Sequence, residues 1–82
     1  LPMVHRAVAE RTIESVKVRF GGQEWWIDVK CGWSEGRITS IKAEYEQVAR
    51  CAQETGFPFR EIAARAEATA RRLFIERGVL DP

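Results

Sequence analysis

The residues with the clearest potential for chemistry lie where a strand-like segment passes into a helical one. The alternating pattern ends near Ile41, and a helical period begins with the carboxylates around Tyr45. Free backbone N–H groups at such a junction attract anions, and carboxylates beside phosphates are typical magnesium ligands. We therefore predict the following candidate nucleotide- or metal-binding residues: Lys30, Lys42, Glu44, Tyr45 and Glu46.

The same residues also fit a purely structural role. Glu44 and Glu46 suit the positive end of a helix dipole. Tyr45 suits a core position with its hydroxyl at the rim. Residue type alone favours the structural interpretation, and we assign no catalytic residue.

A second stretch that could do chemistry is Gly21-Gly22-Gln23. This tripeptide is the one with which peptide-chain release factors hydrolyse peptidyl-tRNA. Here it separates two alternating segments, where a two-residue turn needs glycines with positive φ. We predict a turn and no hydrolase.

The two cysteines, Cys31 and Cys51, do not form a CxxC pair. We predict that both are small, buried, reduced side chains, and a disulfide depends on geometry outside the sequence. A zinc site would need His5 and a carboxylate to join them. Because the spacing of these residues is unlike that of zinc ligands, no metal ligand is assigned.

The elements that would position the candidate residues are strands first and helices second. Residues 16–20 and 25–33 carry apolar side chains at every second position, as in strands with one solvated face. Residues 37–41 are a third, shorter candidate strand. The short glycine-containing connections favour antiparallel hairpins. Residues 4–13 are ambiguous between a strand and a helical turn, and we favour a fourth strand.

Two helices are expected after residue 43. The first has apolar residues at helical spacing, namely Tyr45, Val48, Ala49 and Ala52, and closes at Gly56. The second ends at Gly78, and its predicted buried face consists of Phe59, Ile62, Ala63, Ala66, Ala70, Leu73 and Phe74. Glu61 with Arg65, and Glu67 with Arg71, have the spacing of helical ion pairs.

These elements predict an α+β fold: an antiparallel β-meander of three or four strands, followed by two helices packed on one sheet face. A length of 82 residues corresponds to one small domain, residues 1–82. Thirteen basic and twelve acidic residues give a net charge of +1, which argues against a nucleic-acid partner. With no apolar run of roughly 18 residues and no signal peptide, we expect no membrane association and a cytoplasmic location.

The junction and its neighbours resemble the C-terminal region of the nickel-insertion proteins, which complete the nickel-pincer nucleotide cofactor of lactate racemase. The matching segments are Ile27–Lys30, Gly36, Ala43–Gln47 and Glu54–Pro58, followed by the second helix. The resemblance covers roughly residues 12–77 and is most specific from Glu44 to Pro58.

This resemblance implies CTP with Mg²⁺ or Mn²⁺ as cofactors and nickel as the inserted metal. Lys30, Glu44, Tyr45 and Glu46 are the candidate positions that match the family pattern. Two positions depart from it, because Ala43 replaces the usual proline and Gln47 the usual aspartate. The preceding family subdomain and the large N-terminal region are missing, so we expect a fragment or stand-alone version, and enzymatic activity stays open.

Two functions are compatible with these observations. The first is a nickel-insertion module that contributes to nucleotide or metal binding or to contacts in a homo-oligomer. The alternative is a structural protein–protein interaction module without a ligand. The alternative is motivated by Trp25 and Trp26, which are adjacent and must point to opposite faces of a strand.

Overall fold

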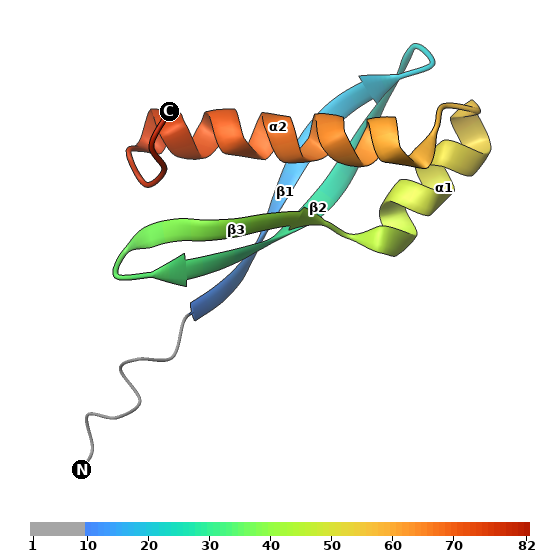
Figure 1. The fold of residues 1–82 in the computed structure, drawn as a ribbon. Helices are drawn as coiled ribbons and strands as arrows, with labels where there is room; N and C mark the ends of the chain where they lie inside the picture. Colours follow the sequence, from blue (N-terminus) through green and yellow to red (C-terminus); the bar gives the residue numbers. More distant parts are fainter. Residues whose placement is uncertain (1–9) are drawn as a thin grey trace.

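A three-stranded antiparallel sheet forms the first half of the protein, and two helices form the second. The computed structural model describes residues 10–82. The strands β1 (Glu10–Phe20), β2 (Gln23–Ser34) and β3 (Arg37–Ala43) lie in the order β1-β2-β3. They are followed by α1 (Tyr45–Thr55) and α2 (Phe59–Arg77) (Figure 1).

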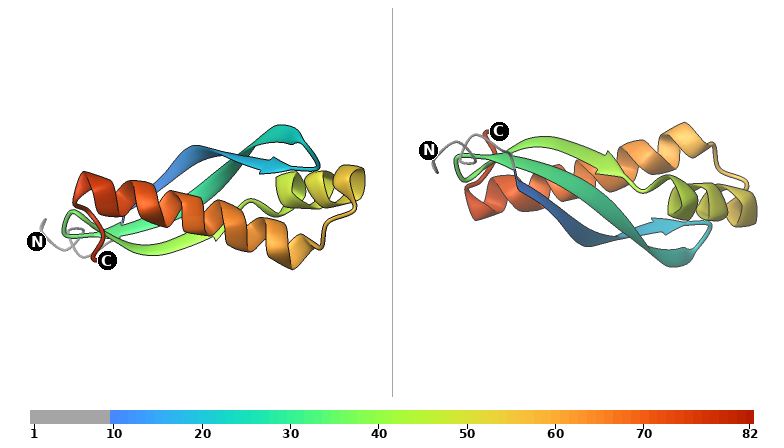
Figure 2. Two further views of the ribbon diagram at one scale, coloured as in Figure 1. Left: turned by 90° about the horizontal axis from the view of Figure 1, so that it is seen from above. Right: turned by 90° about the horizontal axis from the view of Figure 1, so that it is seen from below.

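Both helices lie on the same side of the sheet, and the opposite sheet face is left uncovered (Figure 2). The α+β prediction is therefore confirmed, with three strands in the described part of the chain. The predicted fourth strand falls mostly on residues outside that part, whereas residues 10–13 begin β1. No helix in residues 10–82 combines the length and apolar character that a membrane span needs.

Tight turns set the register of the sheet. Gly21 and Gly22 have φ angles of 61° and 76°, the two positive values that a type I′ hairpin turn requires. Phe20 pairs with Gln23 directly across this turn. The prediction that Gly21-Gly22-Gln23 is a turn is thus confirmed.

The alternation in the strands sorts side chains between the core and the uncovered face. Most apolar residues of β1 and β2 face the helices, and the residues between them, which are mostly polar or charged but include Ile13 and Trp26, face solvent. The buried core consists of Val16, Val18, Phe20, Ile27, Val29, Cys31, Ile38, Ala43, Val48, Cys51, Ile62, Ala66, Ala70 and Phe74.

A β-bulge allows β3 to place two isoleucines on one face. Ile38 and Ile41 are three residues apart, so a regular strand would point them to opposite faces. The register between β2 and β3 shifts at Gly32/Trp33, which brings Ile41 opposite Cys31 and Ile38 opposite Trp33. A Cβ at Gly32 would lie 2.5 Å from Ser40 Oγ, so a larger residue at the bulge would force the Ser40 side chain into another rotamer.

Helix α1 is rotated relative to the prediction. Its buried residues are Val48 and Cys51, whereas the ring of Tyr45 is 69% exposed, so the prediction of a core tyrosine is wrong. Because Glu44 is the N-cap, Tyr45 is the first helical residue and lies outside the sheet–helix interface. Its ring packs on Phe59 instead, with the ring centroids 4.9 Å apart.

Helix α2 buries a narrower stripe than predicted. Ile62, Ala66, Ala70 and Phe74 are buried at four-residue spacing. Phe59 and Leu73 remain 37% and 39% exposed, because a three-stranded sheet and the short α1 cannot cover a wider face.

Charged residues of α2 contact the sheet and do not form the predicted pairs. Neither Glu61–Arg65 nor Glu67–Arg71 occurs among the ion pairs of residues 10–82. The Arg65 guanidinium lies 4.6 Å from the centroid of the Phe20 ring. The half-buried carboxylate of Glu67 accepts a 2.9 Å hydrogen bond from the Ala43 N–H, so α2 holds the end of β3.

We predict that Glu67→Ala lowers the free energy of unfolding by about 1.5–3 kcal/mol, because it leaves the Ala43 N–H without its charged acceptor. Glu67→Gln, which keeps an acceptor oxygen, should lose less. Chemical denaturation measures both, with exposed Glu76→Ala on the same helix as the control. An equal loss in the Glu67→Ala and Glu76→Ala variants would contradict the role of this hydrogen bond.

Candidate functional site

Two of the predicted site residues lie side by side on the uncovered sheet face. Lys30 on β2 pairs directly with Lys42 on β3 in the register of the sheet, and both are exposed. Their strand neighbours Val29, Cys31 and Ala43 are buried under the helices, so the lysines point the opposite way. Like charges directly opposite in a sheet repel each other, so this pair favours an anion between or above them.

Glu44 joins this pair from the start of α1. Its Oε1 atom lies 3.4 Å from Lys30 Nζ. Its backbone N–H donates to the carbonyl oxygen of Asp28 over 2.9 Å, which fixes the position of the residue at the strand–helix junction. Because the ion pair is largely exposed, it contributes about 0–1 kcal/mol and leaves Lys30 accessible to a stronger anion.

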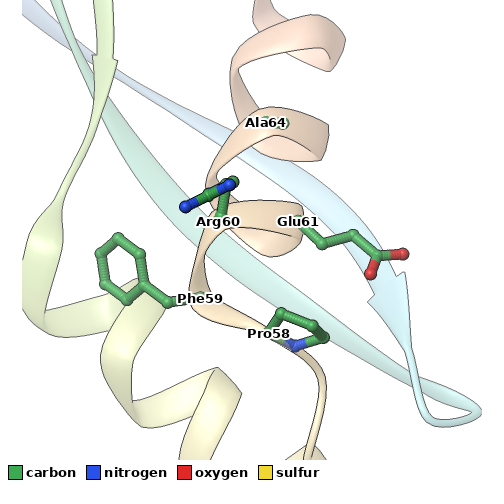
Figure 3. A pocket seen from close by; sticks show the side chains of 5 residues that line it. All are labelled: Pro58, Phe59, Arg60, Glu61 and Ala64. Atoms are coloured by element: carbon green, nitrogen blue, oxygen red, sulfur yellow. The ribbon is translucent and has the colours of Figure 1, made fainter.

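Tyr45 does not join the lysines. It contacts Phe59 at the start of α2, beside a hollow of about 730 Å³ lined by Pro58, Phe59, Arg60, Glu61 and Ala64. Phe59 and Glu61 point to opposite sides of this hollow (Figure 3). The charged residues that line this hollow are Arg60 and Glu61, one of each sign, and its other lining residues are apolar. Because neither sign of charge predominates, the hollow fits an apolar contact better than a charged ligand.

Glu46 lies in a third place, beside the first half of β2. It lines a hollow of about 370 Å³ together with Trp25, Trp26, Gln47 and Arg50, which we call the Trp26 hollow. Trp26 is 62% exposed on the uncovered face. Trp25 is half-buried on the other face, and its indole N–H is buried without an acceptor in residues 10–82. The five predicted residues are thus divided among three places, and only Lys30, Lys42 and Glu44 come together.

Arg11 is a neighbour of Lys30 that no pattern in the sequence singles out. A hollow of about 320 Å³ is lined by Arg11, Thr12, Ile13 and Lys30. Ile13 lies directly opposite Lys30 in the β1–β2 register, on the side away from Lys42. The sequence places Arg11 in a segment of ambiguous structure, so only the register reveals that it adds a cation to this surface.

Asp28 and Gln47 form the support of the junction. The Asp28 N–H donates to Gln47 Oε1, and Gln47 Nε2 donates back to Asp28 Oδ2 over 3.2 Å. Ser15 Oγ donates to the other carboxylate oxygen over 2.8 Å. A glutamine reaches this strand from the first turn of α1, so the residue that departs from the family pattern has a structural role here.

The described residues do not provide a complete metal site. No three His, Cys, Asp or Glu residues of residues 10–82 are grouped closely enough to hold a metal ion, and His5 lies outside this range. Cys31 and Cys51 are free and buried in the core, and burial raises the pKa of both thiols, which disfavours the thiolate that binds metals. Mg²⁺ and Mn²⁺ are compatible with the junction, because Mg²⁺ commonly takes one or two carboxylates and its other ligands from phosphates and water.

Comparison with known proteins links this arrangement to one family. The family described as nickel insertion protein matches residues 2–63. A relative from Methanosarcina mazei that carries this family name is 43% identical over 75 residues, which are 90% of this chain and 19% of the relative. A relative from Methanothermobacter thermautotrophicus is 35% identical over 72 residues, covering 88% of this chain and 17% of the relative. The chain therefore spans less than a fifth of the length of these two relatives.

A solved structure shares the fold. Protein MK0293 from Methanopyrus kandleri AV19 superimposes with a TM-score of 0.63 at 36% sequence identity. The similarity covers 73% of this chain and 34% of that protein.

We predict that Gln47→Ala destabilises the fold by about 1–3 kcal/mol, because the Asp28 N–H and one carboxylate oxygen lose their partner. Urea denaturation measures this loss. Gln53→Ala, an exposed position on the same helix, is the matched control and should change stability by less than about 0.5 kcal/mol. Equal effects at the two positions would show that the Asp28–Gln47 contact does not support the junction.

Proposed function

Because the chain belongs to the nickel insertion protein family, we propose that it serves nickel insertion by binding the phosphates of a nucleotide on its uncovered sheet face. The observation that carries this proposal is the exposed Lys30–Lys42 pair with Glu44 beside it. A triphosphate would neutralise the repulsion between the lysines, and Arg11 adds a further cation at the same surface. The family resemblance suggests CTP as the nucleotide.

Each residue at this site has a distinct role in the proposal. Lys30 and Lys42 bind phosphate oxygens, and binding would draw Lys30 away from Glu44. The Glu44 carboxylate, released from that pair, is the oxygen ligand that the chain offers to a Mg²⁺ or Mn²⁺ ion carried by the phosphates. Glu46 lies beside the Trp26 hollow and is assigned no contact with the phosphates.

Nickel is the cargo in this proposal and not a resident ion. The thiols of Cys31 and Cys51 are buried, so they do not offer soft ligands at the surface. The chain would contribute nucleotide binding, and the chemistry of insertion would belong to the whole protein of the family type.

A second candidate function is favoured by a different observation. Trp26 and Ile13 are each 62% exposed on the uncovered face. Exposed large apolar side chains of this kind mark partner surfaces. The chain would then act as a protein–protein interaction module, with or without nucleotide binding.

The nucleotide proposal predicts a thermal shift. At a concentration ten times the Kd, CTP with Mn²⁺ should stabilise the wild-type chain by about 1.4 kcal/mol, which raises the Tm by about 4–8 °C per kcal/mol for a domain of this size. Lys42→Ala should lose most of the shift. Without ligand, the same variant should be as stable as the wild type or more stable by about 0.2–1 kcal/mol, because the lysine repulsion is gone.

The control is Arg72→Ala, which removes an exposed cation from α2 and should keep the full shift. No shift of the wild type at millimolar CTP and Mn²⁺ would rule the proposal out. A shift that Lys42→Ala leaves unchanged would place the nucleotide elsewhere.

A further inference from the structure

The Trp26 hollow contains the kinds of side chain with which proteins recognise a nucleobase. Its lining residues include the indole rings of Trp25 and Trp26 on β2, and the charged side chains of Glu46 and Arg50 on α1. Aromatic rings stack on bases, and charged side chains bind the hydrogen-bonding groups at the edge of a base. At about 370 Å³ the hollow is large enough to hold a pyrimidine ring.

The two charged groups of this hollow do not pair with each other. Glu46 and Arg50 are four residues apart on α1, a spacing at which opposite charges often form an ion pair. Neither residue occurs among the ion pairs of residues 10–82, and both side chains are exposed. A ligand in the hollow can therefore bind both groups without breaking one of these ion pairs.

The ring of Trp26 is available on the side of α1. It is 62% exposed, and Lys17 Nζ lies 5.7 Å from its centroid. Lys17 pairs with Trp26 from β1, whereas Gln47 of α1 binds the backbone of Asp28 at the opposite edge of β2. The contact with Lys17 thus leaves the ring open toward the hollow, where a base could stack on it.

The hollow lies at a suitable distance from the proposed phosphate site. Trp26, Asp28 and Lys30 are alternate residues of β2 on the uncovered face, so Trp26 and Lys30 are about 13 Å apart along the strand. An extended nucleoside triphosphate bridges a distance of this order. The two carboxylate oxygens of Asp28, midway between them, each accept one hydrogen bond, from Ser15 and Gln47 respectively. Each oxygen can accept a second one, so Asp28 can bind ribose hydroxyl groups.

We propose that the Trp26 hollow binds the cytosine base of the nucleotide and selects it over uracil. The 4-amino group of cytosine would donate to Glu46, since carboxylates accept hydrogen bonds from this amine. Arg50 would donate to the carbonyl oxygen at the other end of the same base edge. Side chains four residues apart on a helix are about 5–6 Å apart at Cβ, which suits these two groups. Uracil has a carbonyl oxygen at position 4, which the Glu46 carboxylate would repel.

This inference rests on the proposed function, in which Lys30 and Lys42 bind the phosphates, and adds base selection to it. The phosphate contacts are common to all nucleoside triphosphates, so they cannot distinguish one base from another. Glu46, which is separate from the lysines, would be the residue that determines specificity, and Trp26 would supply base affinity.

The first test compares the dissociation constants of CTP, UTP and tripolyphosphate, each with Mn²⁺, by isothermal titration calorimetry. The wild type should bind CTP about tenfold more tightly than UTP. In Glu46→Gln the ratio should fall to about one, because a carboxamide can donate to the uracil carbonyl as well as accept from the cytosine amine. Glu54→Gln, an exposed position on α1 that does not line the hollow, is the matched control and should keep the ratio.

The second test examines stacking with the same three probes. Trp26→Ala should weaken the binding of CTP and UTP by about tenfold, because the ring on which the base stacks is lost. The same variant should bind tripolyphosphate as the wild type does. Trp26→Phe keeps an aromatic ring and should retain most of the affinity for both nucleotides.

The outcomes separate this inference from the proposed function. If all three probes bind equally well and Lys42→Ala weakens them all, the phosphate site stands and the base site is overturned. A preference for CTP that survives both Glu46→Gln and Trp26→Ala would place the base elsewhere and would also overturn the inference. If none of the probes binds, both proposals fail.

Discussion

The backbone of Asp28 is the point on which the arrangement of sheet and helices depends. Its N–H and C=O face the edge where β3 has ended, and the first turn of α1 supplies a partner for each. Unpaired backbone groups inside a sheet are costly, so this contact fixes where the strand stops and where the helix begins. The same contact places Glu44 within reach of Lys30 and directs the chain so that α2 can return across the sheet.

Much of the architecture could be predicted from local patterns in the sequence. The alternation around Val16–Phe20 and the glycines at positions 21 and 22 determine a hairpin through steric and periodic rules that act over a few residues. The change to a helical period near Tyr45 is equally local. The position of Tyr45 itself was not predictable in this way, because the N-cap at Glu44 and the contact with Phe59 decide its exposure. The bulge at Gly32 likewise depends on contacts between strands.

The candidate site, like the fold, could be predicted only in part from local sequence patterns. The sequence identifies Lys30, Lys42 and Glu44 by type and spacing, and the structure brings these three together. It separates Tyr45 and Glu46 from them, since successive residues at the start of a helix point in directions about 100° apart. Arg11 and the Asp28–Gln47 contact require the register of β1 and the position of α1, which no short-range pattern specifies.

The order of the elements along the chain has a consequence for how the molecule forms. Neighbouring strands are joined by turns of two residues, so the sheet is built from contacts between residues that are near one another in the sequence. Such local contacts can form quickly. The hairpins alone leave Val16, Ile27 and Val29 without cover. Packing of α2 against β1, which joins residues far apart in the chain, shields this apolar face and closes a longer loop, at a larger entropy cost, than either hairpin.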